Sequence, residues 1–177
     1  GIAGGGANTN VVWHAGRLLA LVEGDPPPME LDPETLATRG VYDFDGALTA
    51  HGLDVLLLWI IFFEIAVLYF ASSTLLNSRL AAPKLGWVAF GLMLGGGLIT
   101  NVSVLQGEST VMFTSYPPLM AAQHFYLGLI LFAVGALLAC GIFFGTLVIA
   151  REEKTYQGSL PLVTYGALTA AIIAVFT

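Results

Sequence analysis

Residues 53–76 read LDVLLLWIIFFEIAVLYFASSTLL, an apolar run that contains two acidic side chains. A helix needs about 20 residues to span the hydrocarbon core of a bilayer. The run lacks the alternation of apolar and polar residues that a membrane β-barrel strand requires. Only helices and closed barrels span lipid, because every backbone polar group needs a partner within the protein. The run therefore predicts a membrane-spanning helix.

Three further apolar segments follow, at about residues 85–105, 125–150 and 162–177. The first two are long enough to span a bilayer, and the last is a few residues short. Residues 1–47 contain the strand-like runs NVVWH, RLLALVE and TRGVYDFD, with the turn-rich link GDPPPMELDPETL before the third. We therefore expect an all-α membrane protein with four transmembrane helices, the last truncated, and a short N-terminal β-meander of three strands. The expected domains are residues 1–47 and residues 48–177.

The composition agrees with a chain that lies in a lipid bilayer. It is 56% hydrophobic and 10% charged, with a mean hydropathy of +0.83, whereas soluble domains carry about 25% charged residues. The net charge is −6 and the six basic residues do not cluster, so no nucleic-acid interface is expected. Cys140 is the only cysteine, which excludes a disulfide framework within the chain.

The basic residues predict the orientation in the membrane. Loops 77–84 and 151–161 carry four Lys and Arg residues, whereas loop 106–124 carries none. Positive loops face the cytoplasm. We therefore expect loops 77–84 and 151–161 to be cytoplasmic, and loop 106–124 and the N-terminal part to lie outside. His51 and Tyr116 then belong to the outer side.

His51 stands at the outer end of the first expected helix, in its first turn. A neutral imidazole is a good iron ligand, and its second nitrogen needs a partner that fixes the tautomer. Asp54 follows at i+3, on a neighbouring part of the same face. The alternative is an interfacial histidine beside a solvated acidic cap. His124, which precedes the third apolar segment on the same side, is either a second iron ligand or an interfacial anchor.

Glu64 lies about 20 Å deeper than His51 by helical rise. An ionisable group at that depth is costly and usually functional. It is either a proton-path residue or a protonated carboxyl hydrogen-bonded to a neighbouring helix. Gly95, Gly96 and Gly97 allow close approach, either of another helix or of a flat cofactor. The sequence has no nucleophile motif, P-loop or HExxH motif, so no catalytic residue is assigned.

Residues 48–177 resemble subunit I of the heme–copper terminal oxidases, the cytochrome c oxidases of the B-type branch. The stretches that carry the resemblance are LTAHGLDVLLLW, MFTSYPPLMAAQHFYLGLILFAVGALL and SLPLVTY, which correspond to helices two to five of that subunit. The resemblance implies that His51 is the outer axial ligand of the low-spin heme. It also implies electron transfer in a respiratory chain, in a prokaryotic plasma membrane. The family's copper and high-spin heme ligands have no counterpart here, so oxygen reduction needs other subunits or the remaining helices of an oxidase complex.

Residues 5–51 resemble one propeller blade of the carotenoid cleavage oxygenases. The stretch is ANTNVVWHAGRLLALVEGDPPPMELDPETLATRGVYDFDGALTAH. In that family the histidine of TAH is one of four that hold a non-heme Fe(II), and here it is His51. The resemblance implies an apparent chimera or fusion joined near GALTAH. An Fe(II)-dependent carotenoid cleavage oxygenase remnant is therefore one alternative function, and a metal-free structural membrane segment is another.

Overall fold

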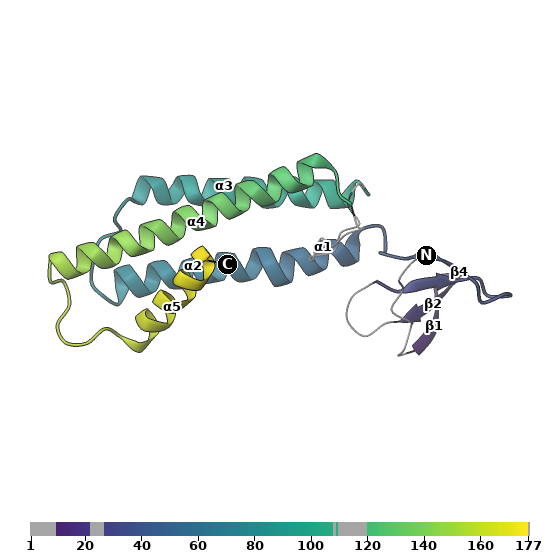
Figure 1. Cartoon of the computed structure of the whole chain (residues 1–177), viewed down its shortest axis with the longest axis horizontal. Helices are drawn as coiled ribbons and strands as arrows, with labels where there is room; N and C mark the ends of the chain where they lie inside the picture. The colour runs from purple at the N-terminus through teal and green to yellow at the C-terminus, as the bar shows by residue number, and fades with distance from the viewer. Residues whose placement is uncertain (1–9, 22–26, 108, 110–119, 177) are drawn as a thin grey trace. The chain divides into compact units, whose positions relative to one another are not determined.

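The structure, a computed structural model, describes residues 10–21, 27–107, 109 and 120–176 (Figure 1). It divides into two units. The sheet unit comprises Gly1–Leu53 and Ser103–Ala122, and the helical unit comprises Asp54–Val102 and Gln123–Thr177.

The sheet unit contains four short antiparallel strands in sequential order. They are β1 (Asn10–His14), β2 (Arg17–Leu21), β3 (Met29–Leu31) and β4 (Thr38–Val41). Ala15 and Gly16, which join the first two, have φ of 46° and 78°, the left-handed conformation that tight hairpin turns need. Leu19 and Ala20 of β2 are buried. These buried hydrophobic side chains therefore lie on one of the two inner strands of the sheet.

The prediction of three strands was wrong, because β3 lies within the segment that we expected to be a turn-rich link. Met29–Leu31 pairs with β2 on one side and β4 on the other. The proline run ends at Pro28, so the residues after it recover the backbone N–H groups that a sheet needs. Of the predicted third strand TRGVYDFD, only Thr38–Val41 is a strand.

Ion pairs join the strands of the meander. Arg17 on β2 donates to the Glu30 carboxylate of β3 over 2.7 Å, and Arg39 on β4 donates to Asp32 over 2.8 Å. Asp32 also accepts from the backbone N–H groups of Thr35 and Glu34. The Thr35 bond, followed by that of Arg39, holds the pKa of Asp32 well below its usual value of 3.8. The turn between β3 and β4 is thus built around one ionised carboxylate.

Ala47–Thr74 forms one continuous helical run. It consists of α1 (Ala47–Leu53), the π-helix η1 (Asp54–Trp59), α2 (Ile60–Tyr69) and the π-helix η2 (Phe70–Thr74). The remaining helices are α3 (Pro83–Leu105), α4 (Gln123–Glu152) and α5 (Leu162–Phe176). Among the described residues, Ala47–Thr74, α3 and α4 are long and apolar enough to cross a membrane, and α5 is shorter. The predicted helical membrane protein with an N-terminal meander is confirmed, with three spans and a shorter fourth apolar helix among the described residues.

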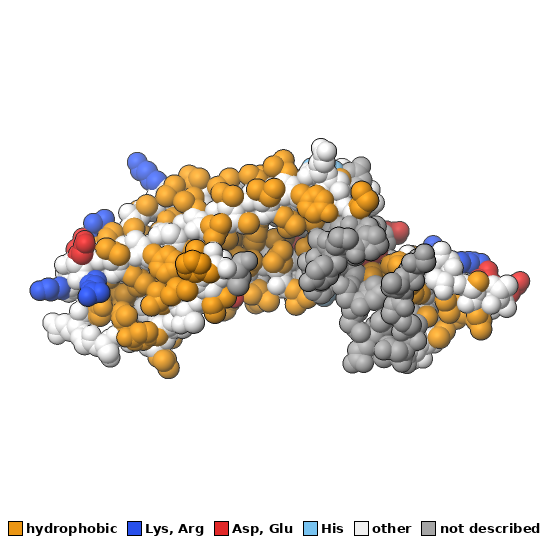
Figure 2. Space-filling view, in the orientation of Figure 1, with side chains coloured by type: hydrophobic (Ala, Val, Ile, Leu, Met, Phe, Trp, Pro, Cys, Tyr) orange, Lys and Arg blue, Asp and Glu red, His pale blue; other side chains and the backbone are white. Residues whose placement is uncertain are grey.

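Large apolar side chains cover much of the face of the helical unit that Figure 2 shows. Trp59, Trp87 and Leu162 are 64%, 75% and 87% exposed. Exposure of such side chains is unfavourable in water but not in lipid. The loops after η2 and α4 lie together, because Arg79 forms an ion pair with Glu153 over 3.0 Å. The predicted basic loops therefore share one end of the helices.

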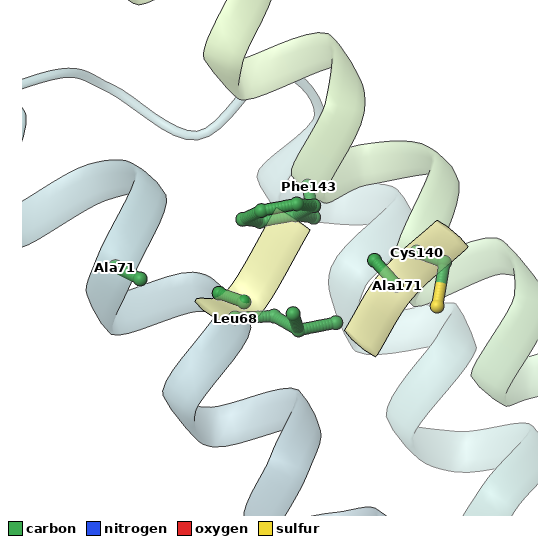
Figure 3. Packing of buried hydrophobic residues seen from close by; sticks show 6 residues of the cluster. Leu68, Ala71, Cys140, Phe143 and Ala171 are labelled. Carbon is green, nitrogen blue, oxygen red and sulfur yellow. The ribbon is translucent and has the colours of Figure 1, made fainter. Parts of the chain in front are cut away.

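Residues from η2, α2, α4 and α5 form a buried cluster in the helical unit (Figure 3). Its members include Leu68, Ala71, Cys140, Phe143 and Ala171. The Thr164 hydroxyl at the start of α5 donates to the Ala71 carbonyl over 2.9 Å. This cluster joins α5 to the longer helices.

Glycines let α3 and α4 approach closely. A Cβ on Gly96 would lie 2.6 Å from the backbone nitrogen of Phe132, and one on Gly135 would lie 2.7 Å from the carbonyl oxygen of Ala89. Small residues of this kind allow helix backbones to meet in lipid. Gly95 has no neighbour within 4 Å of an added Cβ. The helix-packing interpretation of this glycine run therefore applies to Gly96.

We predict that Gly96→Ala destabilises the helical unit and that the adjacent Gly95→Ala does not. A methyl group at Gly96 meets α4 backbone, and overpacking of this kind costs about 1–3 kcal/mol. At Gly95 the methyl group meets open space, and alanine is about 1 kcal/mol better than glycine in a helix. The measurement is the free energy of unfolding in detergent micelles, followed by circular dichroism. Equal stability of the two variants would contradict the close approach of α3 and α4.

Candidate functional site

A tight turn fixes the start of the helix that carries His51. Phe44, Asp45 and Gly46 all have left-handed φ values, of 51°, 56° and 86°. A Cβ on Gly46 would lie 2.6 Å from the Val104 carbonyl oxygen. Only glycine therefore fits at this position, and α1 begins directly after it.

Asp43 caps the first turn of α1. Its carboxylate accepts from the Thr49 backbone N–H over 3.1 Å and from the Thr49 hydroxyl over 2.8 Å. The first N–H groups of a helix have no partner within the helix, so this contact satisfies one of them. Burial raises the pKa of Asp43, and the two bonds from Thr49 oppose that rise. Sequence reasoning missed Asp43, although an acidic residue shortly before a helix is a known capping signal.

His51 is an exposed residue of α1. It follows the helix start at Ala47 by four residues, while Thr49 and Leu53 on either side are 1% exposed. The helix thus turns these two neighbours inward and leaves the imidazole accessible.

Asp54 begins the π-helix η1 and is held by α3. The side-chain nitrogen of Asn101 donates to the Asp54 carboxylate over 2.7 Å and to the Gly97 carbonyl over 3.2 Å. π-Helical segments are rare, and those that occur are often found at functional sites. The predicted partner residue Asp54 is therefore itself anchored to another helix. Sequence reasoning missed Asn101, although an amide inside an apolar segment is a signal of this kind.

Glu64 lines a groove of about 750 Å³ between α2, α4 and α5 in the helical unit. Its side chain is exposed, and it makes no hydrogen bond or ion pair with any residue in the described part of the chain. The rest of the lining is apolar apart from the Cys140 thiol. Glu64 is thus the one acidic residue in this groove among the described residues.

Neither His14 nor His124 is among the residues that line this groove. His14 ends β1 and packs edge-on against the Phe44 ring at 5.9 Å, and His124 is half-buried at the start of α4. Within residues 10–21, 27–107, 109 and 120–176, no three His, Cys, Asp or Glu side chains gather where they could hold a metal ion. Tyr116, predicted at the outer interface, lies outside the described residues.

The N-terminal resemblance is supported by curated proteins. The chain is 62% identical over 50 residues to carotenoid cleavage oxygenase 1 of Neurospora crassa, a match that covers 25% of this chain and 9% of that protein. It is 53% identical over 45 residues to isoeugenol monooxygenase of Pseudomonas putida, which covers 25% and 9%. It is also 56% identical over 55 residues to carotenoid cleavage oxygenase of Mycobacterium tuberculosis, which covers 29% and 11%. The chain therefore spans about a tenth of the length of these relatives.

A larger part of the chain matches a membrane oxidase family. The sequence model described as Cytochrome C and Quinol oxidase polypeptide I matches residues 17–177. No solved structure matches the chain. The predicted combination of an oxidase resemblance with a carotenoid oxygenase resemblance is confirmed. The family match extends over β2 to β4 and all the helices, so the chain belongs to the cytochrome c and quinol oxidase polypeptide I family.

Proposed function

We propose that this chain binds a low-spin heme through His51 and transfers electrons within a respiratory oxidase. The supporting observation is an exposed imidazole near the start of a helical run long enough to cross a membrane. A porphyrin supplies four in-plane nitrogens, so the protein needs to supply only axial ligands. One accessible histidine meets that requirement on one face of the iron.

A second observation argues against a non-heme iron site held by this chain alone. An Fe(II) ion without a porphyrin takes several ligands from the protein. No cluster of three potential ligands occurs within the described residues. The donor set therefore fits heme better than it fits non-heme iron.

The chain's own residues would hold and orient His51. The Asp43 cap and the Gly46 turn fix where α1 begins, and the Asn101–Asp54 hydrogen bond ties the next turn of the run to α3. Heme, when bound, supplies a one-electron couple. These contacts would limit rotation of α1, which would keep the imidazole in one orientation.

The proposed function needs further protein. The second axial ligand, the copper ligands and the high-spin heme ligands have no assigned residue in this chain, so oxygen reduction would depend on other subunits or remaining helices of an oxidase complex. We place this complex in a prokaryotic plasma membrane. The basic loops 77–84 and 151–161 would face the cytoplasm, and His51, the N-terminal part and loop 106–124 would lie outside. We also propose that residues 1–47 and 48–177 have separate origins.

Two alternatives remain. The identities to carotenoid cleavage oxygenases favour an Fe(II)-dependent remnant, in which His51 of TAH would be an iron ligand. The rest of the propeller would have to supply the remaining ligands. A metal-free structural membrane segment is the other alternative. The role of Glu64 in a proton path stays a prediction, supported by its position as an ionisable residue within a membrane span.

We predict that His51→Ala abolishes the low-spin heme signal of the membrane complex. Loss of the axial imidazole removes the strong-field ligand that a low-spin state requires. The measurement is the reduced-minus-oxidised optical spectrum of membranes that contain the assembled complex. The matched control is His14→Ala, because His14 is exposed on β1 and has no place on a membrane helix. An unchanged α band in His51→Ala would show that the heme assignment is wrong.

We also predict that Asn101 and Asp54 act as a coupled pair. Asn101→Leu removes the donor and leaves a half-buried carboxylate without it, which costs about 1 kcal/mol. The double variant Asn101→Leu/Asp54→Leu should cost less than the two single changes added together. The measurement is a double-mutant cycle of unfolding free energies in micelles.

A positioning role of the pair adds a second readout. In the assembled complex, Asn101→Leu should shift the position of the low-spin α band while the heme content stays constant. Additive stability effects would contradict the coupling of Asn101 and Asp54. An α band that does not move would contradict their role in positioning the heme ligand.

A further inference from the structure

One face of the β-meander carries no charged side chain among the described residues. Residues that pair directly across antiparallel strands lie on the same face of the sheet. The pairing of β1 to β4 therefore builds two rows of side chains that cross all four strands on one face. This apolar face consists of Val11, Ala20, Met29 and Val41 in one row and Trp13, Leu18, Leu31 and Thr38 in the other.

The opposite face of the sheet carries the charges and is in contact with the segment that leads to α1. The ion pair of Arg17 and Glu30 lies on this face. The Arg17 guanidinium also lies 4.6 Å from the centre of the Tyr42 ring, and the His14 ring packs against Phe44. Tyr42 and Phe44 belong to the link between β4 and α1. The link therefore holds the sheet by its charged face.

The apolar face is open on both edge strands. Val11 and Trp13 of β1 are 53% and 63% exposed, and Val41 of β4 is 53% exposed. Exposure of such side chains to water is unfavourable, and contiguous apolar patches of this kind mark sites of interaction. The face therefore needs an occupant that accepts apolar side chains and offers no charge.

We propose that the apolar face lies in the interface of the membrane leaflet that α1 enters, with the Trp13 ring at the level of the lipid headgroups. The occupant is the lipid surface of the same membrane that the helical unit spans. The proposal goes beyond the proposed function, because it requires neither heme nor an oxidase complex.

Continuity with the first membrane span supports a lipid occupant. The sheet and α1 belong to one unit, in which β4 ends at Val41 and α1 begins at Ala47. Six steps of backbone reach at most about 20 Å, and Ala47 precedes the apolar run that begins at Leu53 by about 9 Å of helix. The sheet is thus tethered within reach of the leaflet, and a tether of this length makes even weak binding effective.

The size of the apolar face argues against a second copy of the chain as the occupant. The sheet has four strands, which at about 4.8 Å spacing and about 17 Å length give a face of about 300 Å². A stable protein interface buries about 800 Å² on each partner. A lipid surface sets no such minimum for a tethered sheet. Trp13 also suits it, since tryptophan is enriched at the membrane interface.

Electron paramagnetic resonance of the full chain in phosphatidylcholine vesicles tests the proposal. Cys140→Ala removes the native thiol, and Val11→Cys then carries a nitroxide spin label on the apolar face. The matched control is Asn10→Cys, because Asn10 is the preceding residue of β1, is exposed, and lies on the opposite face. We expect oxygen, which dissolves in lipid, to relax the label at position 11, and a water-soluble nickel chelate to relax it several-fold less than the label at position 10.

Charged variants make the test specific to the apolar face. Trp13→Glu places a carboxylate on this face and should raise nickel access at position 11 to the level seen at position 10. Asn10→Glu adds the same charge to the opposite face and should leave position 11 shielded. The width of the spectral lines separates detachment from unfolding, because a label on a strand moves more slowly than a label on an unfolded chain.

Three outcomes would overturn the proposal. Equal nickel access at positions 10 and 11 would show that the face lies in water. Shielding of position 11 from both oxygen and nickel would assign the face to a protein contact, such as a second copy of this chain. Shielding that survives Trp13→Glu would show that the apolar character of the face is not its cause.

Discussion

The requirement that polar groups in lipid find partners within protein governs the helical unit. Hydroxyl groups on the spans meet it by bonding to carbonyls one turn back, as Thr100 does to Gly96 and Thr146 does to Ile142. Asn101 and Asp54 meet it by bonding to each other. The Glu64 carboxyl departs from this pattern within the described residues. The groove that Glu64 lines therefore differs from a purely apolar surface, because it carries a carboxyl group without a partner in the described residues.

The positions of the spans were predictable because length and hydropathy alone decide which segments can cross a bilayer. The start of the first span was less so. Apolarity begins at Leu53, whereas the helix begins at Ala47, because the Asp43 cap and the Gly46 turn extend it by nearly two turns through polar sequence. β3 was missed because a three-residue strand is stabilised by its two neighbours, and a pattern read along the chain does not contain them.

Partners across helices were beyond sequence reasoning for a related reason. Gly95, Gly96 and Gly97 are equivalent in the sequence, yet an added Cβ would meet nothing at Gly95, α4 backbone at Gly96 and the Leu58 side chain at Gly97. Likewise, Asp54 was identified as a neighbour of His51 along one helix, while its bond to Asn101 depends on the register between two helices. The sequence limits which residues are candidates, and packing decides which of them meet.

The number of protein ligands distinguishes the two iron chemistries that the two resemblances imply for His51. Both resemblances imply that this histidine is an iron ligand, so the residue type alone does not distinguish heme iron from non-heme iron. A porphyrin iron needs only axial groups from protein, whereas a bare Fe(II) ion needs several side chains gathered at one point. The described residues offer one exposed imidazole on a membrane span, that of His51, and no such gathering. An oxygenase site would therefore have to be completed almost wholly by residues outside this chain, whereas a heme site would already have its ligand on one face.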